Sequence, residues 1–238
     1  SCDVFFYDLA YKMGIDQIHD SLSLFQFGKK TGLDIPGELG GILPSREWKK
    51  INKDEPWYRG ETLITGIGQG FMTASPIQLA LATGAIANKG KLYTPRVLMH
   101  TQSKNGESYL GPEAQSKQIP IKDISNWDLI EKAMRQAVYG KLGTAKRLNN
   151  KLSYTLAGKT GTAQVFGLDP EEKYIADNID EKLRDHALFT GFAPIENPKV
   201  AIAIIVENAG SGSSKAAPLA RALLDEYFIK NPVDSEKL

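Results

Sequence analysis

The sequence predicts an α+β domain in which an antiparallel sheet is flanked by helices. Helical patterns fill the first part of the chain, short β-rich segments begin only after residue 150, and one more helical pattern follows them. Helices and strands that are segregated along a chain favour an antiparallel sheet over a doubly wound parallel one. The chain has 238 residues, 42% of them hydrophobic and 24% charged, which suits one globular domain with a sizeable core.

Two helical patterns open the chain, over residues 3–13 and 16–27. In both of them apolar residues recur every three or four positions, which is the repeat of a helix that buries one face. Gly14 and Gly28 follow the two patterns, and glycine is the residue that most often ends a helix. We therefore expect two amphipathic helices that together make a helical hairpin.

The next helix is expected only after a long irregular segment. Residues 31–68 are dense in glycine and proline and have no clear period, which indicates a long loop, and such loops are usually functional or mobile. Ser75 and Pro76 then provide an N-cap and a proline at the first helical position. An apolar stretch over residues 77–88 follows, so a helix is expected there.

The second half of the chain changes from helical to strand-like patterns. Ser125 and Asp128 form a variant capping box ahead of a helical pattern over residues 127–139, and a short helix is expected near residues 144–148. Pro218 begins a last amphipathic helix. Between these helices lie short β-rich segments bounded by turn residues, which we interpret as antiparallel strands: residues 154–157, 162–166, 187–192 and 200–207.

Composition excludes several classes of protein. The 29 Lys and Arg residues nearly balance 28 Asp and Glu, and the formal charge of +1 gives no net field that would attract nucleic acid. Cys2 is the only cysteine, so no intramolecular disulfide can form. The longest apolar run, residues 200–206, is far below the roughly 20 residues that span a bilayer. An amphipathic pattern follows Ser1 directly, without the features of a signal peptide, so we expect the chain to begin within a domain.

A cation, two hydroxyls and a glycine are concentrated in Lys159, Thr160, Gly161 and Thr162, which we call the KTGT motif. We expect it at the junction of two strand-like segments. The lysine supplies positive charge, the threonine hydroxyls can donate to a carboxylate, and the glycine allows a substrate backbone to approach the strand edge. The chemistry suits an anionic peptide, and the alternative is an ordinary polar strand start.

The KTGT motif also matches the end of the phosphate-binding pattern G-x-x-x-x-G-K-[ST], but the match fails twice. The first glycine of that pattern would fall on Ser153. Residues 163–166 are strand-like where the pattern requires a helix N-terminus. Nucleotide binding is therefore disfavoured.

Ser1, Cys2 and Asp3 place a hydroxyl and a carboxylate at the start of the first helix, where such residues alone are usually caps. Combined with the KTGT motif, they resemble the second and third elements of the S-x-x-K, S-x-N/D and K-[TS]-G set of class B penicillin-binding proteins. A third likeness is the helix entry of that family that begins with G-Q-G, formed here by Gly68, Gln69, Gly70, Thr73 and Gln78, with Pro76 between them.

The resemblance extends to about Tyr227 and implies the penicillin-binding protein/β-lactamase-like transpeptidase fold. Residues 1–230 would be the C-terminal portion of the transpeptidase domain, and residues 231–238 a tail. The segments most similar to the elongation group of this family, penicillin-binding protein 2, are residues 3–7, 11–16, 56–58 and 159–167.

One element of the family pattern is absent, because no serine in this chain has a lysine three residues later. We therefore expect the nucleophilic serine, the membrane anchor and the early strands to lie upstream, and this chain alone to be inert. A pseudoenzyme and a non-catalytic module that binds muropeptides or β-lactams remain alternatives.

The resemblance implies serine acyl transfer from the D-Ala-D-Ala end of a stem pentapeptide, with β-lactams imitating that donor, and it implies no cofactor. Ser1 would relay a proton and Asp3 would orient the reacting groups. Lys159 would keep the site positive, and Thr160 and Thr162 would hydrogen-bond the substrate carboxylate.

The family also implies a location and partners: the periplasmic face of a bacterial inner membrane, a RodA-type glycosyltransferase and other elongation-complex proteins, and no nucleic acid. Some relatives hold a structural zinc ion through a cysteine at the position of Cys2, and the other ligands would lie upstream. A free buried cysteine is the alternative. His19, His100 and His186 show no ligand spacing, and the charged residues 167–184 are expected to form a solvated loop.

Overall fold

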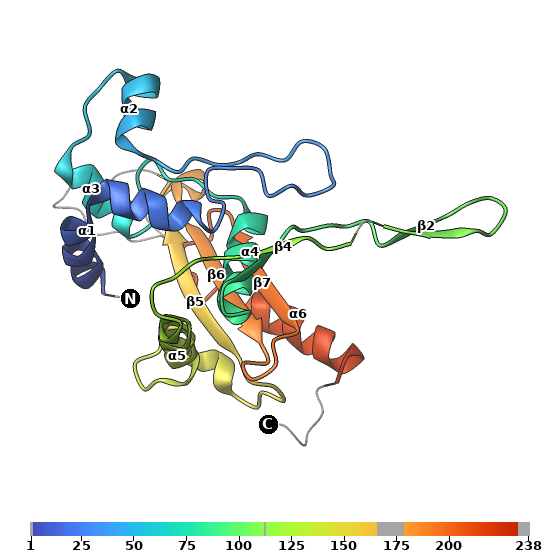
Figure 1. Ribbon diagram of the computed structural model, residues 1–238. Coiled ribbons are helices and arrows are strands. Elements are labelled where there is room, and N and C mark those ends of the chain that lie inside the picture. Colours follow the sequence, from blue (N-terminus) through green and yellow to red (C-terminus); the bar gives the residue numbers. More distant parts are fainter. Residues whose placement is uncertain (1, 112, 166–178, 233–238) are drawn as a thin grey trace. The chain divides into compact units, whose positions relative to one another are not determined.

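The computed structural model describes residues 2–111, 113–165 and 179–232 (Figure 1). Contacts between residues divide the described chain into two compact units. One, which we call the helical unit, contains residues 2–85 and 90–120. The other, which we call the sheet unit, contains residues 86–89 and the described residues from 121 onward. Each unit is described by itself.

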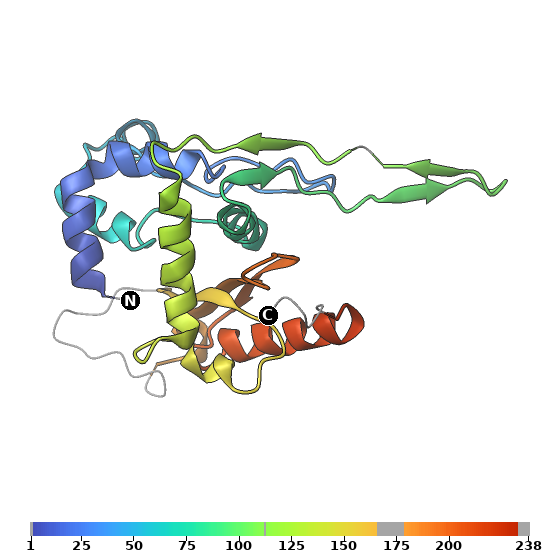
Figure 2. The ribbon, with the colours of Figure 1, turned by 60° about the horizontal axis from the view of Figure 1, so that its bottom comes forward.

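The helical unit begins with α1 (Asp3–Ser23), which is broken at Gly14. Gly14 has φ 76° and ψ 161°, a conformation that side-chain-bearing residues rarely adopt, so it separates two helical pieces as the sequence predicts. Figures 1 and 2 show the two pieces meeting at a corner. The expected hairpin, in which the second helix would fold back along the first, is therefore not formed.

Two short helices, α2 (Arg46–Lys53) and α3 (Arg59–Gly66), occupy the segment that the sequence predicts to be irregular. The Ser45 hydroxyl caps α2 by accepting a hydrogen bond from the Trp48 N–H at 3.0 Å. α3 packs closely on α1, since a Cβ added to Gly66 would come within 3.0 Å of the Ala10 Cβ. The expectation of a loop over residues 31–68 was therefore wrong in these two places, where capping and packing outweigh the weak helical pattern.

The helix predicted after Ser75 is confirmed as α4 (Pro76–Ala87). The Ser75 hydroxyl accepts from the Gln78 N–H at 3.4 Å, as an N-cap does. Beyond α4, two short antiparallel pairs form a ribbon that the sequence did not predict (Figure 2). These pairs are β1 (Lys91–Tyr93) with β4 (Ser116–Gln118), and β2 (His100–Gln102) with β3 (Ser108–Leu110).

The sheet unit contains a three-stranded antiparallel sheet in the order β5-β6-β7 (Figure 1). Its strands are β5 (Ala157–Ala163), β6 (His186–Ala193) and β7 (Val200–Val206). The two segments predicted over residues 154–157 and 162–166 are thus joined by one strand, β5, which runs through the KTGT motif instead of breaking there. The antiparallel sheet with flanking helices confirms the α+β prediction.

Helices α5 (Ser125–Tyr139) and α6 (Ala216–Lys230) complete the sheet unit, with the short 3-10 helices η1 (Lys146–Asn149) and η3 (Glu181–Leu183). α5 packs against β5, and α6 against β6 and β7. The core between them is apolar and includes Val138, Leu156, Phe189, Ala217 and Leu224.

The start of α5 differs in detail from the predicted capping box. The Asp123 carboxylate accepts hydrogen bonds from the N–H and the hydroxyl of Ser125, at 2.9 and 2.7 Å. These bonds, first from the side chain and then from the backbone of Ser125, hold the pKa of Asp123 below its ordinary value. Ser125 is therefore the first helical residue and not the cap. Most of the predicted solvated loop over residues 167–184 lies outside the described residues.

Candidate active site

The KTGT motif occupies the centre of β5, at the end of the strand order β5-β6-β7. Lys159 pairs with Thr190, Thr160 with Phe189, Gly161 with Leu188 and Thr162 with Ala187. On its other side β5 pairs with no strand among the described residues. Since a strand edge can accept an added peptide strand, the motif lies where an extended substrate could pair with backbone.

Two glycines, one on β5 and one on β6, leave room for the ring of Phe189. Gly158 pairs with Gly191, and a Cβ added to either residue would come within 3.0 Å of the Phe189 ring. Phe189 itself is fully buried. The glycine before the KTGT motif is therefore required by core packing, and not by phosphate binding.

Lys159 projects from the exposed part of β5 and lies close to its own strand. Its side chain is exposed, and its Nζ donates to the Thr160 carbonyl oxygen at 2.5 Å. A single cation at a strand edge supplies a local positive potential to any anionic group that pairs there. This position suits the carboxylate-attracting role that the resemblance assigns to Lys159.

The two threonines of the motif differ in environment although both were predicted to bind a carboxylate. Alternation along a strand puts Thr160 and Thr162 on the same face of β5. Thr160 is buried, with 8% of its surface exposed, and its hydroxyl donates to the Thr144 Oγ1 at 2.8 Å. Thr162 is exposed.

Thr144 is the residue at this site that the sequence reasoning missed. It lies in the short connection between α5 and η1, in a region where the sequence indicated only a short helix. The preceding Gly143 is the signal that was available, since a Cβ there would come within 3.0 Å of the Ala137 carbonyl oxygen. A glycine that allows such a close turn fixes where the next side chain points.

The loop before α6 packs against β5 at Gly161, within the motif. Gly212 approaches the Gly161 and Leu188 carbonyl oxygens so closely that a Cβ would come within 3.0 Å of both. The Gly210 N–H holds this loop by donating to the Asp185 carbonyl oxygen at 2.7 Å. Burial raises the pKa of the Asp185 carboxyl above its ordinary value, although the Val165 N–H and the charge of His186 oppose the shift.

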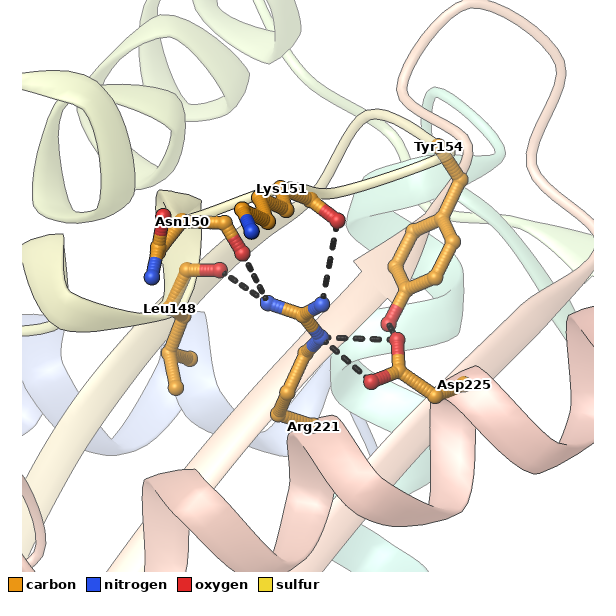
Figure 3. Close-up of polar contacts among 6 residues, drawn as sticks. All are labelled: Leu148, Asn150, Lys151, Tyr154, Arg221 and Asp225. Atoms are coloured by element: carbon orange, nitrogen blue, oxygen red, sulfur yellow. Dashed lines mark hydrogen bonds and ion pairs between the residues drawn. The ribbon is translucent and has the colours of Figure 1, made fainter.

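A cluster around Arg221 fastens the segment that leads into β5 to helix α6 (Figure 3). The Arg221 guanidinium donates to the carbonyl oxygens of Leu148, Asn150 and Lys151 at 2.7, 3.0 and 3.3 Å. Its Nε lies 2.7 Å from both carboxylate oxygens of Asp225.

Tyr154 completes the cluster. Its hydroxyl donates to the Asp225 Oδ1 at 2.8 Å. Burial, followed by this hydrogen bond and the Asp225 charge, raises the pKa of Tyr154 well above its ordinary value. Tyr154 therefore holds a proton throughout the physiological range, and the cluster acts as a fixed anchor for the strand that carries the motif.

The other predicted site residues lie in the helical unit or outside the description. Cys2 precedes α1 and is exposed, so it is not the buried cysteine that was considered as an alternative. Asp3 is the first residue of α1 and is also exposed. Ser1 lies outside the described residues. The structure thus brings the four residues of the KTGT motif together on one strand, and the roles of Ser1 and Asp3 stay predictions.

The described residues do not fit a zinc site. Within residues 2–111, 113–165 and 179–232, no group of three or more His, Cys, Asp or Glu side chains is placed to hold a metal ion. Cys2 offers one exposed thiol, whereas structural zinc takes four ligands. Among the described helices, none is both long and apolar enough to cross a membrane.

Comparison with known proteins places the chain in a family. The family model for the penicillin binding protein transpeptidase domain matches residues 1–225. The chain belongs to this transpeptidase family. Peptidoglycan D,D-transpeptidase MrdA of Haemophilus influenzae is 40% identical over 237 residues, covering 100% of this chain and 36% of that protein. The chain therefore spans about a third of the length of this curated relative.

Solved structures of the family have the same fold. Pseudomonas aeruginosa PBP2, determined in complex with WCK 5153, superposes with a TM-score of 0.81 at 42% identity, over 98% of this chain and 49% of that one. Helicobacter pylori PBP2, in a complex with MreC, gives a TM-score of 0.79 at 33% identity, over 95% of this chain and 38% of that one. These matches confirm the transpeptidase fold predicted from the motifs.

Proposed function

We propose that this chain is part of a serine-type peptidoglycan D,D-transpeptidase of the penicillin-binding protein 2 kind, which cross-links stem peptides during cell elongation. The observation that carries the proposal is the KTGT motif at the edge of β5, with Lys159 and Thr162 exposed beside an unpaired strand edge in the described sheet. The 40% identity to an MrdA transpeptidase over the whole chain supports it.

The substrate is the D-Ala-D-Ala end of a stem pentapeptide, and a β-lactam takes its place. The donor peptide adds to the edge of β5 that pairs with no described strand, and its terminal carboxylate meets the positive potential of Lys159 and the hydroxyls of Thr160 and Thr162. This arrangement fixes the scissile carbonyl relative to the strand, and a backbone N–H just after the motif hydrogen-bonds the developing oxyanion.

The reaction proceeds by two acyl transfers. A serine hydroxyl attacks the carbonyl of the penultimate D-Ala, so a carbon–oxygen bond forms while the peptide bond breaks and the terminal D-Ala leaves as a protonated amine. An amine of a neighbouring stem then takes the acyl group and releases the serine. Residues 1–238 contain no S-x-x-K serine, and we propose that a serine outside them is the nucleophile.

Ser1 and Asp3 are proposed to assist this transfer. Ser1 relays the proton between the attacking and leaving groups, and Asp3 orients them, as the S-x-N/D element does in the family. Acyl transfer of this kind needs no cofactor. A structural zinc ion at Cys2 lacks support in the described residues, which contain no metal-binding group.

The organisation of the whole protein is proposed from its relatives. Residues 1–230 form the C-terminal portion of the transpeptidase domain, and residues 231–238 a tail. The protein acts on the periplasmic side of the inner membrane through an anchor outside these residues. Its partners are a RodA-type glycosyltransferase and elongation-complex proteins, a view supported by the solved complex of Helicobacter pylori PBP2 with MreC.

A fluorescent penicillin tests the proposal. The product of the complete reading frame that encodes these residues is expected to become covalently labelled on a serine of an S-x-x-K element, and Lys159→Ala is expected to lower the labelling rate severalfold or more. Lys230→Ala, an exposed lysine at the end of α6, is the matched control. Absence of labelling would favour the non-catalytic binding module. Labelling of a residue within the 238 would contradict the proposed nucleophile.

A further inference from the structure

We propose that Thr144 is a positioning residue that returns a hydrogen bond to Thr160 when Thr160 binds the substrate carboxylate. The inference rests on the proposed function, because it concerns how the KTGT motif receives an anion. Its starting point is the 2.8 Å hydrogen bond in which the Thr160 hydroxyl donates to the Thr144 Oγ1.

The hydrogen-bond capacity of a hydroxyl makes this contact informative. A threonine hydroxyl has one proton to donate and two lone pairs that accept, whereas a carboxylate only accepts. While the Thr160 proton points to Thr144, it is unavailable to an anion. Thr160 can therefore bind a carboxylate only if its proton turns away from Thr144.

Thr144 is able to compensate for that turn. Its own proton is free to point back at Thr160, because Thr144 is exposed and can give its proton to water in the absence of substrate. The 2.8 Å separation is right for an O–H···O bond, and a small turn of the exposed Thr144 side chain aims its proton at the Thr160 oxygen. The resulting chain runs from Thr144 to Thr160 to the carboxylate, and each bond in such a chain strengthens the next.

The connection that carries Thr144 is held in place by its backbone. The Gly143 N–H donates to the Gly140 carbonyl at 2.9 Å, and the Ala145 N–H donates to the Ala137 carbonyl at 2.9 Å. Ala145 is buried in the core that α5 shares with β6 and α6. Thr144 is therefore presented by a fixed turn and can set the rotamer of Thr160.

Thr162 differs from Thr160 in this respect. It is exposed on β5, and Thr144 contacts Thr160 and not Thr162 in the hydrogen bonds described. Loss of the Thr144 hydroxyl should therefore weaken carboxylate binding through Thr160 alone. This separation makes the proposal testable by double-mutant cycles, in which coupled residues give non-additive effects.

The test measures second-order rates of acylation of the complete reading-frame product by benzylpenicillin and by its methyl ester, which lacks the carboxylate. Thr144→Val is expected to lower the rate with the acid about three- to tenfold and to leave the rate with the ester unchanged. Thr144→Ser keeps a hydroxyl and should restore the rate to within about twofold. Ser153→Ala removes an exposed hydroxyl near β5 and is the control.

The cycle decides between positioning and plain structural support. The double variant Thr144→Val with Thr160→Val should react with benzylpenicillin no more slowly than Thr160→Val alone. In the double variant Thr144→Val with Thr162→Val, the two rate reductions should instead multiply. The inference about Thr144 is overturned, while the proposed function stands, if Thr144→Val slows the reactions with acid and ester equally. It is also overturned if the rate reductions of Thr144→Val and Thr160→Val multiply in the double variant. An unmodified protein that is not acylated, or that reacts equally with acid and ester, overturns the proposed carboxylate site together with it.

Discussion

Gly212 lies against the backbone of Gly161, with no room for a side chain between them: a Cβ on Gly212 would come within 3.0 Å of the Gly161 carbonyl oxygen. The loop before α6 therefore packs directly on the strand that carries the KTGT motif. β5 cannot move away from Gly212 without breaking its hydrogen bonds to β6. The contact therefore fixes the position of the motif relative to the loop before α6.

Gly212→Ala is expected to lower the free energy of unfolding by about 1–3 kcal/mol, as overpacking of a tight contact does. It should also slow acylation by penicillin, because β5 must shift to admit the methyl group. Urea denaturation and acylation rates check both effects. Ser214→Ala, an exposed substitution two residues away, should stay within about 0.5 kcal/mol of the unmodified protein. Equal stability of the two variants would contradict the packing argument.

Arg221→Met should destabilise the sheet unit by about 2–4 kcal/mol. The substitution keeps the aliphatic stem but removes the donors to three carbonyl oxygens and the ion pair with Asp225. Arg221→Lys should not rescue the loss, because one ammonium cannot replace the fork of a guanidinium. Urea denaturation measures both variants.

The control for Arg221 is another ion pair on α6. Lys230 lies 2.8 Å from Glu226, and both side chains are exposed. Exposed ion pairs contribute little to folding stability. Lys230→Met should therefore change the free energy of unfolding by less than about 0.5 kcal/mol. If Arg221→Met cost no more than Lys230→Met, the cluster would not anchor the segment before β5.

Asp185→Asn tests a dependence of stability on pH. Burial raises the pKa of Asp185 in the folded protein, so as pH rises above the ordinary value of 3.8 the carboxyl ionises first in the unfolded chain. Stability is therefore lost as pH rises towards the raised folded pKa, and the loss stays constant above it. Asp185→Asn removes the ionisation, and its amide oxygen can still accept from the Val165 N–H.

The unmodified protein should therefore lose stability relative to Asp185→Asn between about pH 4 and the raised pKa of Asp185. Denaturation of both proteins at a series of pH values from 4 to 8 measures the difference. A difference that is independent of pH, or that grows in the opposite direction, would show that the burial of Asp185 does not control its ionisation.

The elements that the sequence predicted correctly have local causes. Gly14 breaks α1 through its own positive φ, and Ser75 with Pro76 begins α4 through the cap and the fixed ring. The fold class followed from the order of helical and β-rich segments. Membership of the transpeptidase family was predicted from motifs that lie far apart in the sequence. Each of these motifs is short and specific.

The elements that the sequence missed depend on distant partners. α2 is a polar helix with no apolar repeat, and it contains Lys49, which is buried by contacts beyond its own helix. Burial opposes the charge of Lys49, but the hydrogen bonds and charges of Glu61 and Glu55 outweigh it and raise the pKa of Lys49. No local pattern predicts such a contact.

The candidate site was predicted in part for the same reason. The KTGT motif was recognisable, but its glycines suggested a break between two strands, and only pairing with β6 makes one continuous strand of it. The difference between Thr160 and Thr162 was not predictable, because it depends on Thr144 in another element. Residues that act through a neighbour leave little signal in a single sequence.

Gln78 provides the last prediction, since this fully buried amide joins two loop segments, at residues 26–29 and at Gly40, to the start of α4. Its Nε2 donates to the carbonyl oxygens of Lys29 and Gly40 at 2.9 and 2.8 Å, and to that of Gln26 at 3.2 Å. Its Oε1 accepts from the Ser75 N–H at 2.9 Å. One side chain therefore serves three carbonyl oxygens and one N–H of the backbone.

Gln78→Leu should lower the free energy of unfolding by about 2–4 kcal/mol, because the Lys29 and Gly40 carbonyl oxygens and the Ser75 N–H lose their hydrogen bonds to this side chain. Gln78→Glu keeps an acceptor for Ser75 but loses the donors, so it should be destabilising as well. Hydrogen exchange at the Ile42 and Thr73 amides, which bond each other's carbonyls at 2.9 and 3.0 Å, should accelerate in both variants.

Gln17→Leu, on the exposed side of α1, is the matched control and should change stability by no more than about 0.5 kcal/mol. Equal stability of Gln78→Leu and Gln17→Leu would mean that water or small backbone shifts satisfy the carbonyl oxygens that Gln78 bonds. If the variant were less stable but hydrogen exchange at the Ile42 amide were unchanged, Gln78 would not stabilise the bridge between Ile42 and Thr73. Acceleration at that bridge is expected, because Gly41 beside it has no room for a Cβ against the Thr73 carbonyl oxygen and so has little freedom to repack.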